Sequence, residues 1–290
     1  MRPRKFPWFS HLLVAVGAVI MVVPFLDMLF TSFKGPGEFG TLPYRFLPED
    51  FGVANYEAAF SQLDMPRLFG NSVLMTTTAV FSVLLTSSMA GYALAKLRFK
   101  GRAVLFRFVL STMMFPPFLF LIPNFLILSR WPGVGGNNLL GEGGYGGMMT
   151  TYGALFLPFL VSGFGIFLMR QFIVTIPDEM LEAARIDGAG ELRIWWSVVV
   201  PQTKAALITL GLLTFVGVWN EYVWTLLVST VNPDLMTLPV GIQLLQSYLD
   251  PSLTQPIVMA GLVVSTLPVL VVFLLLQKYY IRGLMLSGMK

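Results

Sequence analysis

Charged residues are scarce in this chain of 290 residues, where Asp, Glu, Lys and Arg together make up only 12%. A soluble domain carries about 25% charged residues, so this sequence has too little polar surface for an ordinary soluble globule. Apolar residues make up 56% and fall in long runs. Long runs are typical of membrane-spanning helices, whereas the strands of membrane barrels alternate. The composition therefore predicts an all-α integral membrane protein.

Cysteine is absent, which excludes disulfide bonds, cysteine-based zinc sites and thiol nucleophiles. His11 is the single histidine, so a metal site built from several histidines is excluded as well. A G-x-x-x-x-G-K-[ST] phosphate loop does not occur in the sequence. We therefore predict no catalytic residue, no metal ligand and no cofactor site in this chain, and no nucleic-acid partner.

Apolar segments of the length that crosses a bilayer core, about 20 residues, occur six times. They cover residues 11–33, 70–95, 103–128, 151–174, 205–230 and 256–276. The first follows the basic sequence MRPRK, but it is too long for the apolar core of a signal peptide and no cleavage pattern follows it. We expect it to remain as a span, and residues 1–290 to form a single transmembrane domain.

Lys and Arg in the loops predict the orientation, because they are enriched on the cytoplasmic side of a membrane protein. With the N-terminus inside, most of the 19 basic residues fall in inner segments, Arg2, Arg4, Lys5 and Lys290 among them. Only Lys34, Arg45, Arg67 and Arg130 fall in outer segments. Both termini are therefore expected in the cytoplasm, beneath the plasma membrane, and residues 175–201 on the same side.

Two outer loops differ in character. Residues 34–66 hold several acidic residues and prolines, and we expect them to form an ordered external cap. Residues 131–150 hold eight glycines, which is typical of a flexible linker. We expect this second loop to be flexible.

Residues 175–201 lie between the fourth and fifth predicted spans and hold repeated charges. Thr175 is expected to cap a helix whose first turn holds Pro177, Asp178 and Glu179, which the helix dipole favours. Gly188 is expected to end this helix in the left-handed conformation, and a second helical piece follows at 191–199. An amphipathic interfacial helix that only joins two spans is one interpretation of this pattern. The small residues Ala183 and Ala184, flanked by opposite charges, suit a second one, close approach by another protein.

The string EAARIDGAGELRIWWSVVVP at 182–201 resembles the EAA loop of the permease subunits of ABC importers. The family's pattern is E-A-A, three residues, G, nine residues and then I-x-L-P. Here Glu182-Ala183-Ala184 is followed by Gly188 at that spacing, and then by Val198-Val199-Val200-Pro201. Valine replaces the isoleucine and the leucine of the pattern, and both changes are conservative.

Further segments look like the carbohydrate-uptake branch of that family, and within it like the maltose-transporter-type permease with six spans. They are MMFP and IP at 113–116 and 122–123, IFLMRQF at 166–172, AARIDGA at 183–189, WNEY at 219–222 and GLMLSG at 283–288. The similarity covers most of the chain from residue 33 onward. The resemblance implies six transmembrane helices with a cytoplasmic coupling-helix loop at 175–201.

This resemblance also implies a mechanism and partners. In the family, the EAA helix docks into a cleft on an ATP-hydrolysing subunit, and closure of two such subunits rocks the spans between inward and outward access. The implied coupling residues are Glu182, Ala183, Ala184, Arg185, Asp187 and Gly188. The implied partners are a second permease subunit, two subunits that bind ATP and magnesium, and an external substrate-binding protein.

Acidic residues inside the predicted spans are functional candidates, and there are two, Asp27 and Glu221. Glu221 lies in Trp219-Asn220-Glu221-Tyr222, where aromatic faces, an amide and a carboxylate suit sugar rings. We predict that these four residues line the translocation path. A polar contact between helices of two permease subunits remains the alternative. Asp27 either contributes to the path or pairs locally.

Three functions compete at this point. An ion-coupled secondary transporter of small polar solutes would show more spans, internal repeats and more buried carboxylates than this chain has. An intramembrane enzyme would need a histidine, a cysteine or paired acids inside the spans. The sequence favours a permease subunit of an ATP-driven importer for a sugar or sugar derivative, and it does not name the sugar.

Overall fold

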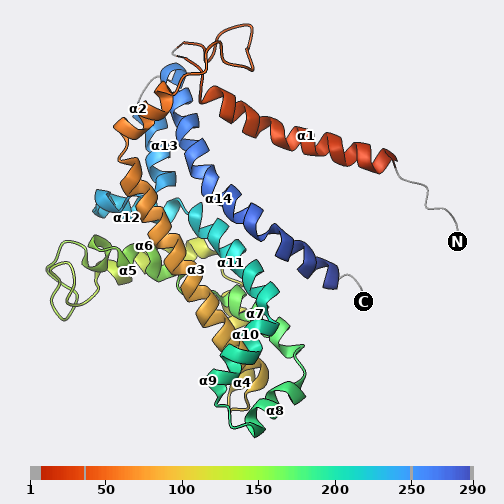
Figure 1. Cartoon of the computed structure of the whole chain (residues 1–290). Coiled ribbons are helices and arrows are strands. Elements are labelled where there is room, and N and C mark those ends of the chain that lie inside the picture. The colour runs from red at the N-terminus through yellow and green to blue at the C-terminus, as the bar shows by residue number, and fades with distance from the viewer. Residues whose placement is uncertain (1–7, 36, 249–250, 288–290) are drawn as a thin grey trace. The chain divides into compact units, whose positions relative to one another are not determined.

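A computed structural model describes residues 8–35, 37–248 and 251–287 (Figure 1). The described residues form helices and connecting loops without any β-strand, which confirms the predicted all-α fold class. Both termini lie outside the described residues. The same holds for several residues of the sequence argument, namely Arg2, Arg4, Lys5, Gly288 and Lys290.

Three of the described helices are long and apolar enough to cross a membrane alone. They are α1 (Trp8–Thr31), α3 (Met65–Lys96) and α14 (Pro251–Ser287), and they match the spans predicted at 11–33, 70–95 and 256–276. α14 is unbroken although Pro256 and Pro268 lie inside it. Counting each bent helix pair as one span raises the total to six.

The other predicted spans are bent pairs rather than single helices. α4 (Arg102–Thr112) meets Pro117–Ser129, which comprises η1 (Pro117–Phe120) and α5 (Leu121–Ser129), at 97°. The bend falls where Pro116 takes an extended conformation with ψ 137°, because two consecutive prolines cannot continue a helix. Gly153–Phe159, which holds α6 (Gly153–Phe156) and η3 (Leu157–Phe159), meets α7 (Gly163–Val174) at 44°.

The predicted fifth span, 205–230, is wrong as a single helix. α11 (Lys204–Trp219) ends at Trp219, and α12 (Val223–Val231) begins after three residues of non-helical backbone. At its other end, α11 meets Glu191–Gln202 at 82°. That segment comprises α9 (Glu191–Ile194), a π-helical turn η4 (Trp195–Val199) and α10 (Val200–Gln202).

Contacts divide the chain into two compact units, Met1–Pro66 with Pro239–Pro268, and Arg67–Leu238 with Val269–Lys290. The prediction of one domain over the whole chain stays a prediction. The first unit contains α1, α2 (Ala54–Gln62), most of α13 (Leu238–Tyr248) and the first part of α14.

The described residues of the predicted cap, 34–35 and 37–66, make an ordered set of hydrogen bonds in the first unit, as predicted. Asn55 donates from its amide to the carbonyl oxygens of Ser32 and Lys34 at 2.9 and 2.8 Å. The carboxylate of Glu38 accepts backbone N–H groups on both sides of this loop, from Gly35 at 3.0 Å and Glu49 at 3.1 Å. Asp27 accepts a hydrogen bond from the hydroxyl of Tyr44, so its carboxylate has a local partner.

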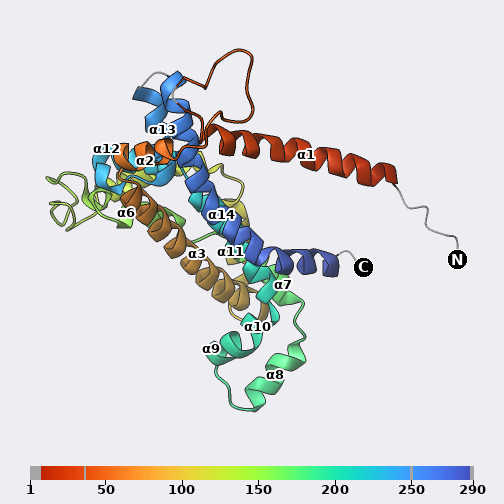
Figure 2. The ribbon, with the colours of Figure 1, turned by 45° about the horizontal axis from the view of Figure 1, so that its top comes forward.

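The second unit is built around α3, and Figures 1 and 2 show two groups of helices along it. α8 (Asp178–Ile186), α9 and α10 gather at the C-terminal end of α3, whereas α5, α6 and α12 lie along its other half. Gly91 marks the close approach of α3 and α7, because a Cβ atom there would lie 3.0 Å from both the Met169 Cβ and the Arg170 backbone nitrogen. Small residues allow such close helix packing in membranes.

Each half of this unit has its own apolar cluster. The α8 cluster comprises Val83, Tyr92, Ala95, Met169, Ile173, Ile176, Leu181, Ile194, Val199, Ala206 and Leu210. The α12 cluster comprises Met75, Ala79, Leu128, Met149, Ala154, Leu155, Val218, Trp224, Val228 and Leu235.

Residues 131–150, called the glycine-rich loop from here on, have a defined fold, contrary to the prediction of a flexible loop. The Asn137 amide donates to the carbonyl oxygens of Ser129 and Trp131, both at 3.0 Å. The side chain of Asn138 accepts two backbone N–H groups across the turn, from Leu140 and Glu142. The glycines are needed because the loop packs against itself: a Cβ atom at Gly147 would lie 2.5 Å from the Ser129 carbonyl oxygen. Composition alone does not distinguish this packing from a linker.

Candidate functional site

The predicted EAA segment forms α8, which begins at Asp178. Pro177 precedes the helix in an extended conformation with ψ 135° and occupies the N-cap position. Asp178 and Glu179 lie in the first turn and Arg185 in the last, which suits the helix dipole. The prediction that Thr175 caps this helix is wrong. Thr175 instead ends α7, where its hydroxyl donates to the Phe172 carbonyl oxygen at 2.8 Å.

The end of α8 follows the sequence prediction closely. Gly188 has φ +79°, a conformation that costs other residues energy because of their Cβ atom. Its N–H donates to the Arg185 carbonyl oxygen, and the N–H of Ala189 donates to that of Ala184, both at 3.0 Å. These two bonds form a Schellman motif, which turns the chain sharply toward α9.

One face of α8 is buried and the opposite face is open. Leu181 is 1% exposed and belongs to the α8 cluster, and Ala184 packs against that cluster. Five of the predicted coupling residues are exposed, namely Glu182, Ala183, Arg185, Asp187 and Gly188. Ile186 is 86% exposed as well. α8 therefore presents its small and charged residues outward instead of burying them against its own spans.

Lys96, the last residue of α3, holds the start of α8 in place through hydrogen bonds. Its Nζ donates to the Ile176 carbonyl oxygen at 2.5 Å and to the Asp178 carboxylate at 2.6 Å. A third, longer bond of 3.3 Å reaches the Val174 carbonyl oxygen at the end of α7. The Lys96 side chain is only 8% exposed. Its hydrogen bond and its charge hold the pKa of the Asp178 carboxyl below the usual value.

A second set of polar contacts holds the other end of α8 in place. The Arg185 guanidinium donates to both carboxylate oxygens of Glu191, at 2.9 and 3.3 Å. The hydroxyl of Tyr92 on α3 donates to the same carboxylate. Arg185 thus shares its charge with Glu191, whereas Glu182 makes no ion pair within the described part of the chain. Sequence reasoning missed Tyr92, Lys96 and Glu191. Tyr92 and Lys96 bond to residues 99 and 82 positions away, and Glu191 bonds to Tyr92 and, across the turn at Gly188, to Arg185.

The second predicted group, Trp219 to Tyr222, forms the break between α11 and α12. Trp219 is 2% exposed, and its ring lies against Phe215 at 5.6 Å and Phe69 at 5.8 Å. Asn220 is exposed, and its amide donates to the Val216 carbonyl oxygen at 2.8 Å. Glu221 accepts the backbone N–H of Trp224 at 2.8 Å, so one of its oxygens caps α12.

A hollow of about 700 Å³ opens beside this break. Among the described residues that line it, Glu221 and Asn124 are the only polar side chains besides the indole of Trp224, and Phe118, Phe120 and Phe159 supply aromatic walls. The Trp224 indole N–H is already bonded to the Ala154 carbonyl oxygen at 2.9 Å. The hollow therefore combines aromatic surface with a carboxylate and an amide. Asn124 was not among the predicted residues, because nothing near it in the sequence sets it apart.

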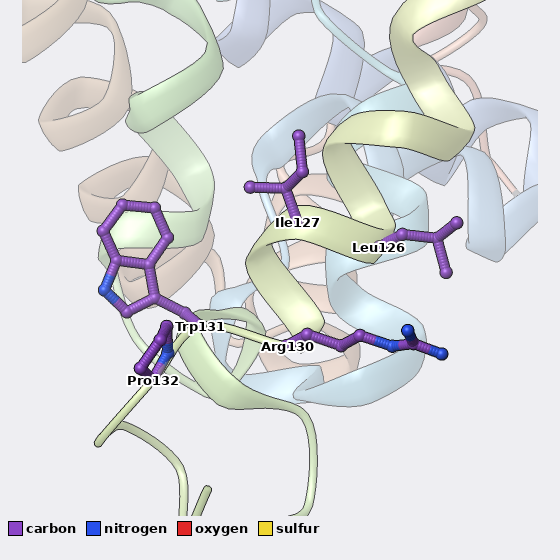
Figure 3. Close-up of a pocket in the computed structure, with 5 residues that line it drawn as sticks. All are labelled: Leu126, Ile127, Arg130, Trp131 and Pro132. Atoms are coloured by element: carbon purple, nitrogen blue, oxygen red, sulfur yellow. The ribbon is translucent and has the colours of Figure 1, made fainter. Parts of the chain in front are cut away.

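A different hollow, of about 510 Å³, lies at the end of α5. Figure 3 shows its lining residues, Leu126, Ile127, Arg130, Trp131 and Pro132. The Arg130 side chain extends away from Trp131 and Pro132 in this view. Its polar groups do not converge, so this surface lacks the geometry of a ligand site.

Residues 58–285 match the family described as "Binding-protein-dependent transport system inner membrane component". The chain belongs to this family. The family assignment suggested by the EAA motif is thus confirmed. The protein is a multi-pass membrane permease subunit, and membership implies ATPase and substrate-binding partners.

Individual relatives agree with this assignment. The arabinooligosaccharides transport system permease protein AraQ of Halalkalibacterium halodurans is 32% identical over 100% of both chains. The diacetylchitobiose uptake system permease protein NgcG of Streptomyces coelicolor is 30% identical, over 95% of this chain and 86% of that protein. The sn-glycerol-3-phosphate transport system permease protein UgpE of Yersinia enterocolitica is 29% identical, over 97% and 96%.

A solved structure matches the fold. It is a chain of a bacterial ABC transporter involved in the import of the acidic polysaccharide alginate. The match has a TM-score of 0.77 and 25% identity, and it covers 96% of this chain and 97% of the other. Because the match covers nearly all of both chains, it supports a permease fold over nearly the whole chain.

Proposed function

We propose that this chain is one of two permease subunits of an ATP-driven importer for a sugar or sugar derivative. Relatives named for arabinooligosaccharides, diacetylchitobiose and glycerol phosphate support this class of cargo. The complete importer would contain a second permease subunit, two ATP-binding subunits and an external substrate-binding protein. The protein lies in the cytoplasmic membrane with both termini in the cytoplasm, and ATP is hydrolysed by its partners.

The open face of α8 carries this proposal. Leu181 anchors the helix, while Glu182 and Ala183 are exposed beside it. A partner surface approaches the backbone at the exposed Ala183, and its cationic or N–H groups bind the Glu182 carboxylate. Arg185, Asp187 and Gly188 complete the contact by fixing the end of the helix. Movement of the ATPase subunits then reaches the spans through the bonds of α8 to Lys96 and Glu191.

The four residues at the break between α11 and α12 are proposed to serve the translocation path. Glu221 faces the hollow, and Trp219, Asn220 and Tyr222 shape the break that holds it there. A sugar ring would stack on the aromatic walls and donate its hydroxyls to Glu221. This assignment makes the subunit a direct contact for the cargo.

Charge reversal at Glu182 tests the coupling role. In Glu182→Lys we expect normal membrane insertion, with ATPase-subunit binding about tenfold or more weaker, because a charge-assisted bond is replaced by repulsion. The measurements are capture of the ATPase subunits by the purified variant and uptake by cells. Glu142→Lys, an exposed charge reversal in the glycine-rich loop, is the control and should behave like wild type. Wild-type binding and uptake in Glu182→Lys would contradict the proposal.

A further inference from the structure

Three arginines surround a hollow of about 590 Å³ beside α4 and α7. Arg102 and Arg107 lie on α4, and Arg170 lies on α7. Each donates once to a backbone carbonyl oxygen, Arg102 to Leu97 at 3.1 Å, and Arg107 and Arg170 to Ala103 and Leu94 at 3.3 Å. A guanidinium has five N–H donors, so each retains several for a ligand.

Carboxylates do not occur among the described residues that line this hollow. Its lining holds the three arginines but no acidic side chain. None of the three forms an ion pair within the described residues, whereas Lys96, Arg185 and other cations of the chain do. Three guanidinium charges facing one hollow repel one another, and a bound anion relieves that repulsion.

Apolar side chains form the remaining walls. Phe99, Val104, Phe106 and Leu94 line the same hollow. The Arg170 guanidinium lies over the Phe106 ring at 3.9 Å, which holds it in place. Val104 and Phe99 are 63% and 43% exposed, so an apolar surface continues outward from the charged centre. A ligand that fits carries an anionic group joined to an apolar chain.

The position of the hollow points to a lipid. It lies where Gly101, with φ +88°, turns the chain between α3 and α4, at the end of two membrane-crossing segments. The loop charges predict this end to be the inner face, where anionic phospholipids bind basic residues near the helix ends.

We propose that Arg102, Arg107 and Arg170 bind the phosphate headgroup of an anionic glycerophospholipid, with an acyl chain along Val104 and Phe99. Guanidinium groups match phosphate oxygens in paired hydrogen bonds, which a lysine does not reproduce. This site is separate from the open face of α8 and does not depend on the cargo of the importer.

Native mass spectrometry of the purified intact importer complex, with phosphatidylglycerol or phosphatidylcholine added, tests this site. Wild type should retain phosphatidylglycerol in preference to phosphatidylcholine. The double variant Arg102→Gln/Arg107→Gln should bind phosphatidylglycerol about tenfold more weakly, since each basic residue near the surface contributes to binding. It leaves Arg170, which packs on Phe106, in place. Double replacement with lysine should restore part of the affinity.

Arg130→Gln is the matched control, because it removes one arginine from a hollow whose side chains diverge. It should bind phosphatidylglycerol like wild type. Equal retention of both lipids by wild type, or unchanged phosphatidylglycerol binding in the double variant, would overturn the proposal. Displacement of the lipid by inorganic phosphate alone would assign the site to free phosphate instead. Loss of the ATPase subunits with unchanged lipid binding would assign it to a protein contact. Transport is not measured, so failure here leaves the proposed function standing.

Discussion

Glu221 is the one acidic side chain among the residues that line the hollow beside the break between α11 and α12. One of its oxygens accepts the Trp224 N–H and caps α12, while the carboxylate as a whole faces aromatic walls. A carboxylate in this setting binds a sugar hydroxyl strongly, because hydrogen bonds to charged groups contribute about 1.5–3 kcal/mol.

Glu221→Gln removes the negative charge of this side chain but keeps an oxygen that can cap α12. A glutamine oxygen can still accept the Trp224 N–H, so the helix should keep its start. We expect the KM for uptake to rise about tenfold, because the charge-assisted bond to cargo is weakened. ATPase-subunit binding should not change. Glu142→Gln, the same change at an exposed carboxylate in the glycine-rich loop, should transport like wild type. Unchanged uptake in Glu221→Gln and Glu221→Leu would favour the alternative role as a contact between helices.

The roles of some residues around α8 can be predicted from the sequence, and the roles of others cannot. Gly188 was predictable, because a left-handed helix end after Asp187 strongly favours glycine. Thr175 was predicted wrongly. Pro177, two residues later, disfavours helical backbone at the residue before it, and the helix starts after Pro177. Lys96 and Tyr92 were not predictable, since their partners lie 82 and 99 residues away.

At the scale of elements, α8 is a short helix held at both ends. The Arg185–Glu191 pair is half-exposed, at 37% and 46%, and such pairs contribute about 0–1 kcal/mol. Their role is therefore to fix the position of α8 relative to α3 and α9, and most of the stability comes from Leu181 in the α8 cluster.

Glu191→Ala should loosen α8 without unfolding the protein. The variant loses the bonds to both Arg185 and Tyr92, so we expect amide exchange within α8 to become up to about fivefold faster, as loss of about 1 kcal/mol allows. Hydrogen exchange with mass spectrometry on the purified complex measures it. Tyr92→Phe removes a single bond and should show a smaller effect. Asp234→Ala, which removes the partner of Arg67 in another ion pair, should leave α8 unchanged. Unaltered exchange in Glu191→Ala would show that the contacts of Glu191 with Arg185 and Tyr92 do not hold the helix in place.

Long apolar helices such as α1 and α14 were predictable from hydropathy alone. Broken ones were not located, because a hydropathy window averages over the break. Signals were nevertheless present: Pro116 is followed by a second proline, and polar residues interrupt the apolar run at 220–222. Both positions coincide with bends or breaks in the structure.

At the scale of the whole molecule, the distribution of charge predicts which face α8 occupies. Lys34, Arg45, Arg67 and Arg130 are the few basic residues outside the inner segments, among 19 in the chain. Family membership places the protein in a membrane but does not orient it. The proposed docking of ATPase subunits requires α8 in the cytoplasm, where ATP is found.

Cysteine labelling tests this orientation directly, because the chain has no native cysteine to interfere. Asp187→Cys places a thiol on the open end of α8, and Leu139→Cys places one in the glycine-rich loop, where Leu139 is 87% exposed. A membrane-impermeant maleimide should label Leu139→Cys in right-side-out vesicles and Asp187→Cys in inside-out vesicles. Ala79→Cys, at a fully buried position, should react in neither preparation. The reverse pattern would put α8 on the outer face, beyond the reach of any ATPase, and the coupling mechanism would then fail together with the orientation.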